Sequence, residues 1–318
     1  MIALSLTVVV VLIVFLASRQ TDQRGTVEFF AAAQEAVTLE ESAAQTFDQA
    51  LASIGVVSRQ DLTQRLESIV EKTAEANGLI TAVEQVPSDV GSEYGTMLTA
   101  STSWEAGAQE ADRVIIGIMD GEIVETAVPE LQHALDLLAV GDTAYDLYLS
   151  SIEVMPEAVD ATLFPSVRFV DPDPDDPARY NATNLVLRIQ SAYGLAPHHD
   201  VSIAGRTDPG AVGDRDGIPV VPFSDAIAMI ALVTNEGNEP EAGIGVSLTV
   251  VNVDTGALVS RSEVVTELDV GTSTTVRFDA IEIEPGGLYQ ANFTARINGD
   301  IDLTNNDWTM TFIWNAES

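Results

Sequence analysis

Apolar side chains fill the first 17 positions of the chain almost without interruption. Residues 1–17 carry no charged side chain, and only Ser5 and Thr7 are polar. A bilayer core is about 30 Å thick and a helix rises about 1.5 Å per residue, so a helix over residues 2–17 would span roughly 24 Å. Arg19 can extend this length by snorkelling.

Three interpretations fit this stretch, and an uncleaved transmembrane anchor over residues 1–19 is favoured. A cleaved signal peptide would show a basic residue before the apolar run and a small-x-small cleavage site, and Leu16-Ala17-Ser18 is a poor one. A buried core helix would show a polar face, which the run lacks. If most of the chain is exported, Arg19 and Arg24 lie on the outer side of the membrane, against the positive-inside rule. A short cytoplasmic segment before the given start would explain this.

Apolar positions then recur at three-, four- and seven-residue steps, a spacing that predicts amphipathic helices over residues 26–152. The first helix ends before Gly55. The second begins at a Ser58 cap, with Asp61 three residues on as in a capping box, and Pro87 lies beyond its end.

A third helix is expected from residue 88 to Gly121 and a fourth from residue 124 to residue 152. Gly141 either divides the fourth helix or is tolerated within it. Four amphipathic helices with short connections favour an antiparallel bundle over residues 26–154.

Residues 155–217 are predicted to be a linker with short strands at residues 167–170 and 185–189. From residue 218 the apolar period becomes two, with Gly, Asn, Asp and Pro at the separators. The expected strands are 226–234, 245–253, 257–266, 273–281, 288–298 and 307–314. Short strands at this spacing are typical of an immunoglobulin-like β-sandwich, here over residues 218–316. The predicted fold class is therefore multidomain α plus β: an N-terminal transmembrane helix, an antiparallel helical bundle and a C-terminal immunoglobulin-like β-sandwich.

Composition narrows the function. The net charge of −35 repels phosphate backbones, so nucleic acid is not an expected partner. The absence of cysteine excludes disulfides. Hydrophobic residues make up 46% of the chain, so the acidity does not indicate disorder.

The turn residues of the β half carry a resemblance to a known family. They are Asn235-Glu236-Gly237-Asn238, Leu268 with Gly271, Pro285-Gly286 before Tyr289, and Asp300 before Asn305-Asn306. This pattern resembles the CARDB-type, cell-adhesion-related domain of bacterial and archaeal surface proteins, over residues 220–314. The resemblance implies an extracellular, non-catalytic module with a structural or adhesive role, and it brings no catalytic residues with it.

The helical half resembles uncharacterised actinobacterial exported proteins in two short motifs. These are Ser103-Trp104-x-x-Gly107 and Gly141-Asp142-x-Ala144-Tyr145. Trp104 and Tyr145 could line a ligand pocket, but filling the bundle core is the favoured interpretation. His133 is interpreted as an exposed helix residue rather than a ligand.

Two segments invite a metal interpretation that we do not favour. The acidic run over residues 171–177 offers carboxylates for calcium, but its prolines and lack of glycine favour a solvated, semi-rigid loop. In His198-His199-Asp200 the two imidazoles would point to opposite sides of an extended chain. We predict no catalytic, cofactor-binding or metal residues and no cofactor.

The predicted function follows from these points. The chain has no nucleophile elbow, P-loop, zinc motif or dinucleotide fingerprint, and 49 acidic residues make any carboxylate pairing uninformative. We expect a single-pass, membrane-anchored, extracytoplasmic protein with a structural, adhesive or partner-binding role, not an enzyme. Its expected partners are the membrane, other envelope proteins or surface polymers. The alternative is an accessory subunit of a receptor or transporter that binds a ligand in its helical bundle. Asn181-Ala182-Thr183 and Asn292-Phe293-Thr294 are candidate glycosylation sequons.

Overall fold

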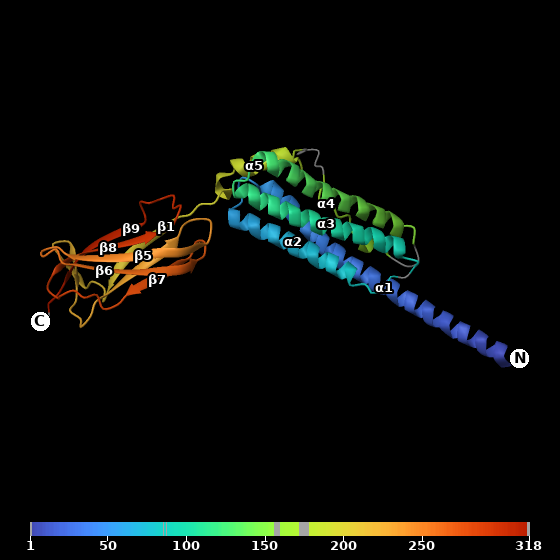
Figure 1. Ribbon diagram of the computed structural model, residues 1–318, viewed down its shortest axis with the longest axis horizontal. Coiled ribbons are helices and arrows are strands. Elements are labelled where there is room, and N and C mark those ends of the chain that lie inside the picture. Colours follow the sequence, from blue (N-terminus) through green and yellow to red (C-terminus); the bar gives the residue numbers. More distant parts are fainter. Residues whose placement is uncertain (1, 85, 87, 156–159, 172–177, 317–318) are drawn as a thin grey trace. The chain divides into compact units, whose positions relative to one another are not determined.

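The computed structural model describes the backbone of residues 2–316 apart from 85, 87, 156–159 and 172–177, and the side chains from residue 24 onwards. The chain forms two compact units, Met1–Ala196 and Pro197–Ser318 (Figure 1). The first is helical and the second is built of strands. Each unit has its own cluster of buried apolar side chains.

Four long helices make up most of the first unit, and each packs along the next. They are α1 (Ile2–Ser53), α2 (Arg59–Thr81), α3 (Gly91–Met119) and α4 (Val124–Ile152). The Ser58 hydroxyl caps α2 by accepting a 3.1 Å hydrogen bond from the Asp61 amide, as the sequence predicted. Gly141 lies inside a continuous α4, so it does not divide the helix.

The transmembrane helix predicted at residues 1–19 requires a correction. The side chains of residues 1–23 lie outside the described part of the chain. Within the described part, no helix combines the length and the apolar character needed to cross a bilayer. The described stretch of α1 alternates buried apolar side chains with exposed polar ones, because one of its faces packs in the unit and the other meets water. The fold is therefore a helical unit followed by a β-sandwich, without an established transmembrane helix.

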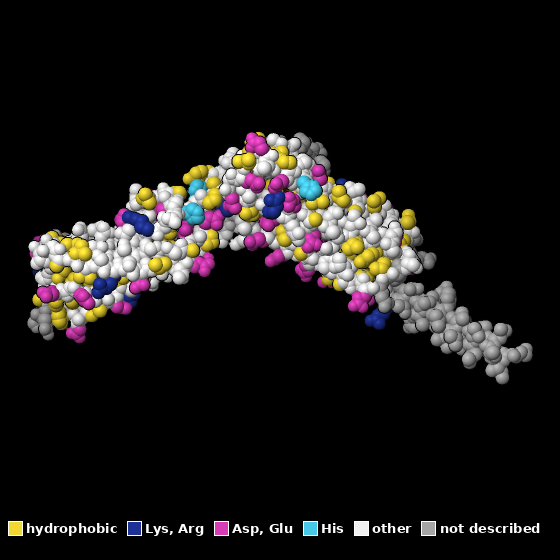
Figure 2. Space-filling view, in the orientation of Figure 1, with side chains coloured by type: hydrophobic (Ala, Val, Ile, Leu, Met, Phe, Trp, Pro, Cys, Tyr) yellow, Lys and Arg dark blue, Asp and Glu magenta, His cyan; other side chains and the backbone are white. Residues whose placement is uncertain are grey.

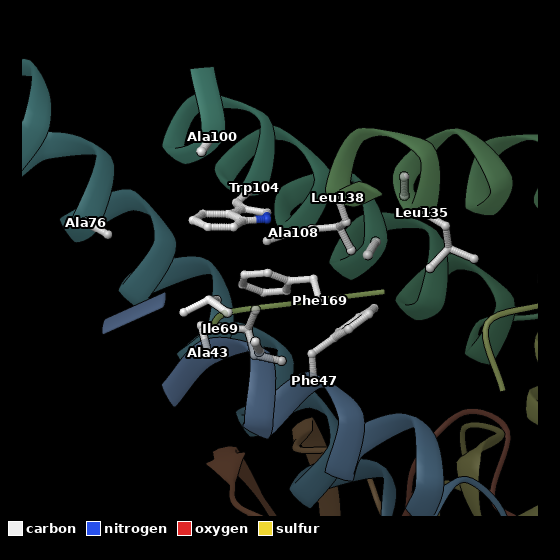
Figure 3. Close-up of a cluster of buried hydrophobic side chains, with 14 of the residues drawn as sticks. Ala43, Phe47, Ile69, Ala76, Ala100, Trp104, Ala108, Leu135, Leu138 and Phe169 are labelled. Atoms are coloured by element: carbon white, nitrogen blue, oxygen red, sulfur yellow. The ribbon is translucent and has the colours of Figure 1, made fainter. Parts of the chain in front are cut away.

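The segment that follows α4 fills the space between α1 and α4. After the short helix η1 (Ala161–Leu163), the Phe164 ring contacts Phe30 of α1 and Tyr148 of α4. Farther along, the Phe169 ring lies between Phe47 of α1 and Trp104 of α3 (Figure 3). This segment thereby closes the core of the helical unit.

Two short strands predicted in the linker are wrong. Residues 167–170 form no strand; they belong to the segment that closes the helical core. Residues 185–189 lie in a helix, α5 (Ala182–Ser191), which packs against α3 and α4 and precedes η2 (Tyr193–Leu195). The buried side chains of α5 include Leu185, Val186 and Ile189, a spacing that fits one face of a helix.

Two sheets make up the second unit. The first has the strand order β1-β4-β7 and the second β2-β3-β9-β8-β5-β6. Neighbouring strands are antiparallel except β3 and β9, which are parallel. The strands are β1 (Val201–Asp208), β2 (Gly213–Arg215), β3 (Ile218–Val221), β4 (Ala228–Asn235), β5 (Glu241–Asn252), β6 (Leu258–Leu268), β7 (Ser273–Phe278), β8 (Leu288–Arg296) and β9 (Asp307–Trp314).

The six predicted strands correspond to β4 through β9, but the unit begins earlier than predicted. β1 lies inside the predicted linker, at residues 155–217, and pairs with β4 along its whole length. Its Val201 and Ile203 side chains are buried in the sandwich core. The division between the units falls after Ala196, so the predicted linker is shared between both units.

Candidate binding cleft of the helical unit

A buried carboxylate on α4 anchors the segment that closes the helical core. Asp142 Oδ1 accepts hydrogen bonds from Trp104 Nε1 and from the Phe169 amide, both at 2.9 Å. Its Oδ2 accepts a third, also at 2.9 Å, from the Val170 amide. Burial raises the pKa of the Asp142 carboxyl, and the three hydrogen bonds oppose that rise. Asp142 thus ties α3, α4 and the segment after α4 together.

Glycine permits the close approach of these groups. A Cβ atom on Gly141 would overlap the Trp104 indole ring, so only glycine lets the ring lie against α4. Likewise, a Cβ atom on Gly107 would lie 2.7 Å from Leu138 Cγ. The two glycines belong to the two motifs noted in the sequence, and the fold brings these motifs into contact.

Tyr145 adds a second anchor to the same segment. Its hydroxyl donates a 2.8 Å hydrogen bond to the Pro165 carbonyl, and its ring stacks on Tyr148 with centroids 5.8 Å apart. The backbone is therefore held on both sides of Arg168, by Tyr145 at residue 165 and by Asp142 at residues 169 and 170.

The segment anchored in this way forms one wall of a cleft of about 550 Å³ on the surface of the helical unit. Helix α1 provides the other wall. The residues that line the cleft are Glu41, Ala44, Gln45, Asp48, Gln49, Ser166, Val167, Arg168, Asp171, Arg179 and Tyr180.

Both arginines that line the cleft are paired with acidic side chains. Arg179 Nη1 lies 2.7 Å from Asp48 Oδ1, and the Tyr180 hydroxyl donates to the same oxygen at 3.0 Å. Arg168 Nη2 lies 2.6 Å from Oδ2 of Asp146, an α4 residue next to the cleft. Burial, followed by the hydrogen bond to Asp48, raises the pKa of the Tyr180 hydroxyl. The cleft therefore presents a fixed pattern of donors and acceptors.

Neither Cys nor His lines the cleft. Across the described residues, no group of three or more His, Cys, Asp or Glu side chains is arranged to hold a metal ion. The cleft is therefore equipped to recognise polar or charged groups, and its lining carries no arrangement of nucleophile and base.

The two aromatic residues proposed from the sequence as pocket candidates do come together. The Trp104 and Tyr145 ring centroids are 5.4 Å apart, but both side chains are 0% exposed and belong to the packed core. The interpretation of these residues as core residues is confirmed. His133 is exposed on α4, as predicted. Residues 172–177 of the acidic run lie outside the described residues.

The structure also places the histidine pair and the two sequon asparagines. His199 Nδ1 lies 2.8 Å from Glu241 Oε1, while the His198 carbonyl accepts from the Asn238 amide. Asn181 caps α5 by accepting from the Asn184 amide at 3.0 Å. Asn292 is exposed on β8.

Acidic side chains from distant parts of the chain meet at one end of the sandwich. Asp200 Oδ1 accepts from Asn305 Nδ2 at 3.0 Å, and Asp300 Oδ2 accepts from Asn306 Nδ2 at 2.8 Å. Burial, followed by the charges of Asp300, Glu236 and Asp302, raises the pKa of Asp200. Asn305 of the CARDB-like pattern thus joins the residue before β1 to the loop before β9, and Asn306 bonds within that loop.

Sequence reasoning missed the residues of the cleft, including Asp48, Arg168, Arg179 and Tyr180. Asp48 and Arg179 are separated by 131 positions, so no local spacing indicates that they meet. The Gly141-Asp142 pair was the one available signal. A glycine followed by an acidic residue is unusual inside the apolar pattern of a helix.

Comparison with known proteins gives a fold-level likeness only. No protein-family model and no curated protein matches the chain. Among solved structures, the crystal structure of the CARDB domain of the PF1109 protein from Pyrococcus furiosus, in complex with di-metal ions, is 19% identical with a TM-score of 0.27. The match covers 38% of this chain and 89% of that one. The solution structure of the same domain is 18% identical with the same TM-score, covering 38% and 97%. The C-terminal unit resembles a CARDB domain.

This likeness agrees with the turn motifs of the sequence.

A third match is the Pseudomonas fluorescens alkylpurine DNA glycosylase AlkC bound to DNA containing an abasic site analogue. It is 12% identical with a TM-score of 0.25, and the match covers 88% of this chain and 97% of that one. At TM-scores this low, neither likeness carries an argument about what this chain binds or catalyses.

Proposed function

We propose that this protein is a non-catalytic, extracytoplasmic protein with a structural, adhesive or partner-binding role, and that its cleft contacts the partner. The observation that carries the proposal is the pairing of both cleft arginines with acidic side chains of the same unit. Arg179 pairs with Asp48, and Arg168 pairs with Asp146. Pairing holds these groups in place before a partner arrives, so less conformational entropy is lost on binding.

Charge distribution supports a protein or polymer partner rather than a nucleic acid. Asp and Glu side chains are spread over both units on the face shown in Figure 2, with few Lys or Arg side chains between them. At the cleft, Arg168 and Arg179 place two positive charges on a chain whose net charge is −35. A partner with exposed carboxylates or hydroxyls would add charge-assisted hydrogen bonds to these paired groups.

Co-sedimentation of the purified full-length chain with envelope material of the producing cells tests the proposal. Arg179→Glu reverses a charge at the cleft and should reduce binding at least tenfold. Arg113→Glu is the matched control, because it also breaks ion pairs on the surface of the helical unit, with Glu110 and Glu130. Equal binding by both variants would refute the role of the cleft. Recovery of the native protein entirely from the cytosol would refute the location.

A small polar ligand is the second candidate, because a volume of about 550 Å³ lies within the range of small-molecule sites, roughly 300–1,000 Å³. The ligand site would then be the cleft and not the surroundings of Trp104 and Tyr145, which are packed. A thermal shift with a panel of metabolites, lost in Arg179→Glu and kept in Arg113→Glu, would favour this alternative.

A further inference from the structure

Strand β6 is an open edge of the larger sheet. Within the described residues it pairs with β5 and with no other strand. Residues 258, 260–264, 266 and 267 are exposed, and Leu268 at the end of the strand is the one buried position. An exposed edge of eleven residues carries backbone donors and acceptors that another strand can pair with.

The register with β5 assigns the side chains of β6 to two faces. Arg261 lies opposite Leu248 and Glu263 opposite Val246, so both charged side chains are on the face that β5 turns toward the sandwich core. Ser262 lies opposite Ser247 on the outer face. Natural sheets use inward-facing charges to block pairing at an edge strand. The sign and order of the charges on β6 therefore decide whether another strand can pair with it.

The order of residues along β6 is self-complementary. If a second β6 runs antiparallel with Ser262 opposite its own counterpart, Arg261 of each copy faces Glu263 of the other. One step farther out on the same face, Val259 faces Val265. Opposite charges and β-branched pairs directly across an antiparallel ladder are stabilising, at about 0.2–1 kcal/mol each. Two blocking charges of the same sign would give repulsion in this register.

The surroundings of β6 favour another copy of an acidic chain. Around the symmetry point, the outer face carries uncharged hydroxyls from Ser247, Thr249, Ser260 and Ser262. Arg261 Nη2 lies 3.8 Å from Glu282 Oε1, and the Arg261 side chain is 42% exposed. Directly across the ladder, each Glu263 therefore meets an arginine of the other copy and not an acid.

We propose that two copies of this chain associate through β6, antiparallel and centred on Ser262, so that their six-stranded sheets continue into one another. The interface is isologous, with a two-fold axis at Ser262. The dimer presents two copies of the rest of the chain to any common partner, which strengthens weak binding through avidity.

Charge reversal in the full-length chain tests the pairing. Sedimentation equilibrium should show a monomer–dimer equilibrium, and Arg261→Glu or Glu263→Arg alone should weaken dimerisation at least tenfold. The double variant R261E/E263R restores opposite charges in the same register, and should restore dimerisation. Arg215→Glu, on β2 at the opposite edge of the sheet, is the matched control and should leave the dimer intact. A native chain that is monomeric at every concentration would overturn the proposal. A double variant R261E/E263R that folds but does not dimerise would overturn it as well.

Disulfide trapping tests the register independently. The chain contains no cysteine, so a single introduced thiol can form only an intermolecular disulfide. Opposite Cα atoms in an antiparallel ladder lie about 4.5–5.5 Å apart, within the range that a disulfide spans. Ser262→Cys should therefore cross-link in a buffer containing oxidised glutathione. Ser260→Cys should not, because its counterpart is displaced by about 13 Å along the strand. Equal cross-linking of the two variants would contradict this register.

Discussion

The fully buried Glu40 of α1 makes the stability of the helical unit depend on pH. Its side chain is 0% exposed, and neither carboxyl oxygen has a hydrogen-bond partner among the described residues. Burial, followed by the charge of Glu105, raises the pKa of Glu40 well above its ordinary value of 4.5. The folded protein therefore keeps a proton that the unfolded chain releases.

The sign of the effect follows from this difference in bound protons. Below pH 4.5 both states are protonated, and Glu40 carries no ionisation cost. As the pH rises above that value, the unfolded state ionises first, and stability falls by about 1.4 kcal/mol per pH unit until the folded pKa is passed. Between pH 4.5 and pH 7 the loss therefore amounts to a few kcal/mol at most.

Glu40→Gln removes the ionisable group and keeps the shape of the side chain. Relative to the native chain, the variant should gain stability as the pH rises from 4.5, by a few kcal/mol at most at pH 7. Burying the amide also changes the free energy of unfolding, but this contribution is the same at every pH.

Urea unfolding at a series of pH values measures this gain. The helical signal in far-UV circular dichroism reports on the helical unit, because the other unit is built of strands. Glu35→Gln is the matched control, since Glu35 is exposed on the same helix and the charge change is identical. A stability difference between Glu40→Gln and the native chain that stays constant with pH, or shrinks as the pH rises, would refute the reasoning.

Two further predictions follow from the packing. Asp142→Ala leaves three hydrogen-bond donors without their acceptor, and at about 1–3 kcal/mol each the variant should lose roughly 4 kcal/mol in urea unfolding. Asp142→Asn keeps one acceptor oxygen and should lose less; equal losses would contradict this account. Calorimetry of isolated sandwich fragments should show a cooperative melt for residues 197–318 and none for residues 216–318, because the shorter fragment lacks β1 with its buried Val201. A cooperative melt of the shorter fragment would show that β1 is dispensable.

Local patterns were sufficient to predict most of the regular structure. The helix boundaries at Gly55, Ser58 and Gly121 depend on caps and turns, whose chemistry lies within a few neighbouring residues. The strand 307–314 was predicted with its observed bounds, since turn residues precede it. Such signals are local, and a single sequence displays them.

The failures have physical reasons too. The stretch at residues 185–189 is short and apolar, and such a run does not distinguish a strand from a buried helix face. The Asn181 cap was the signal that could have decided it. β1 was missed because its single apolar pair, Val201 and Ile203, is flanked by turn residues. The cleft was out of reach, since its two walls come from α1 and from residues 166–168, 171, 179 and 180.

The contact of Trp104 with Gly141 has a consequence for how this sequence can diverge. The indole ring occupies the space that any side chain at position 141 would need, so neither position can change alone without loss of packing. A larger residue at 141 becomes acceptable only after the residue at 104 becomes smaller, and the donor to Asp142 is then lost as well. Mutational drift at these three positions is therefore correlated. In related sequences, tryptophan, glycine and aspartate should therefore be kept or replaced as a set.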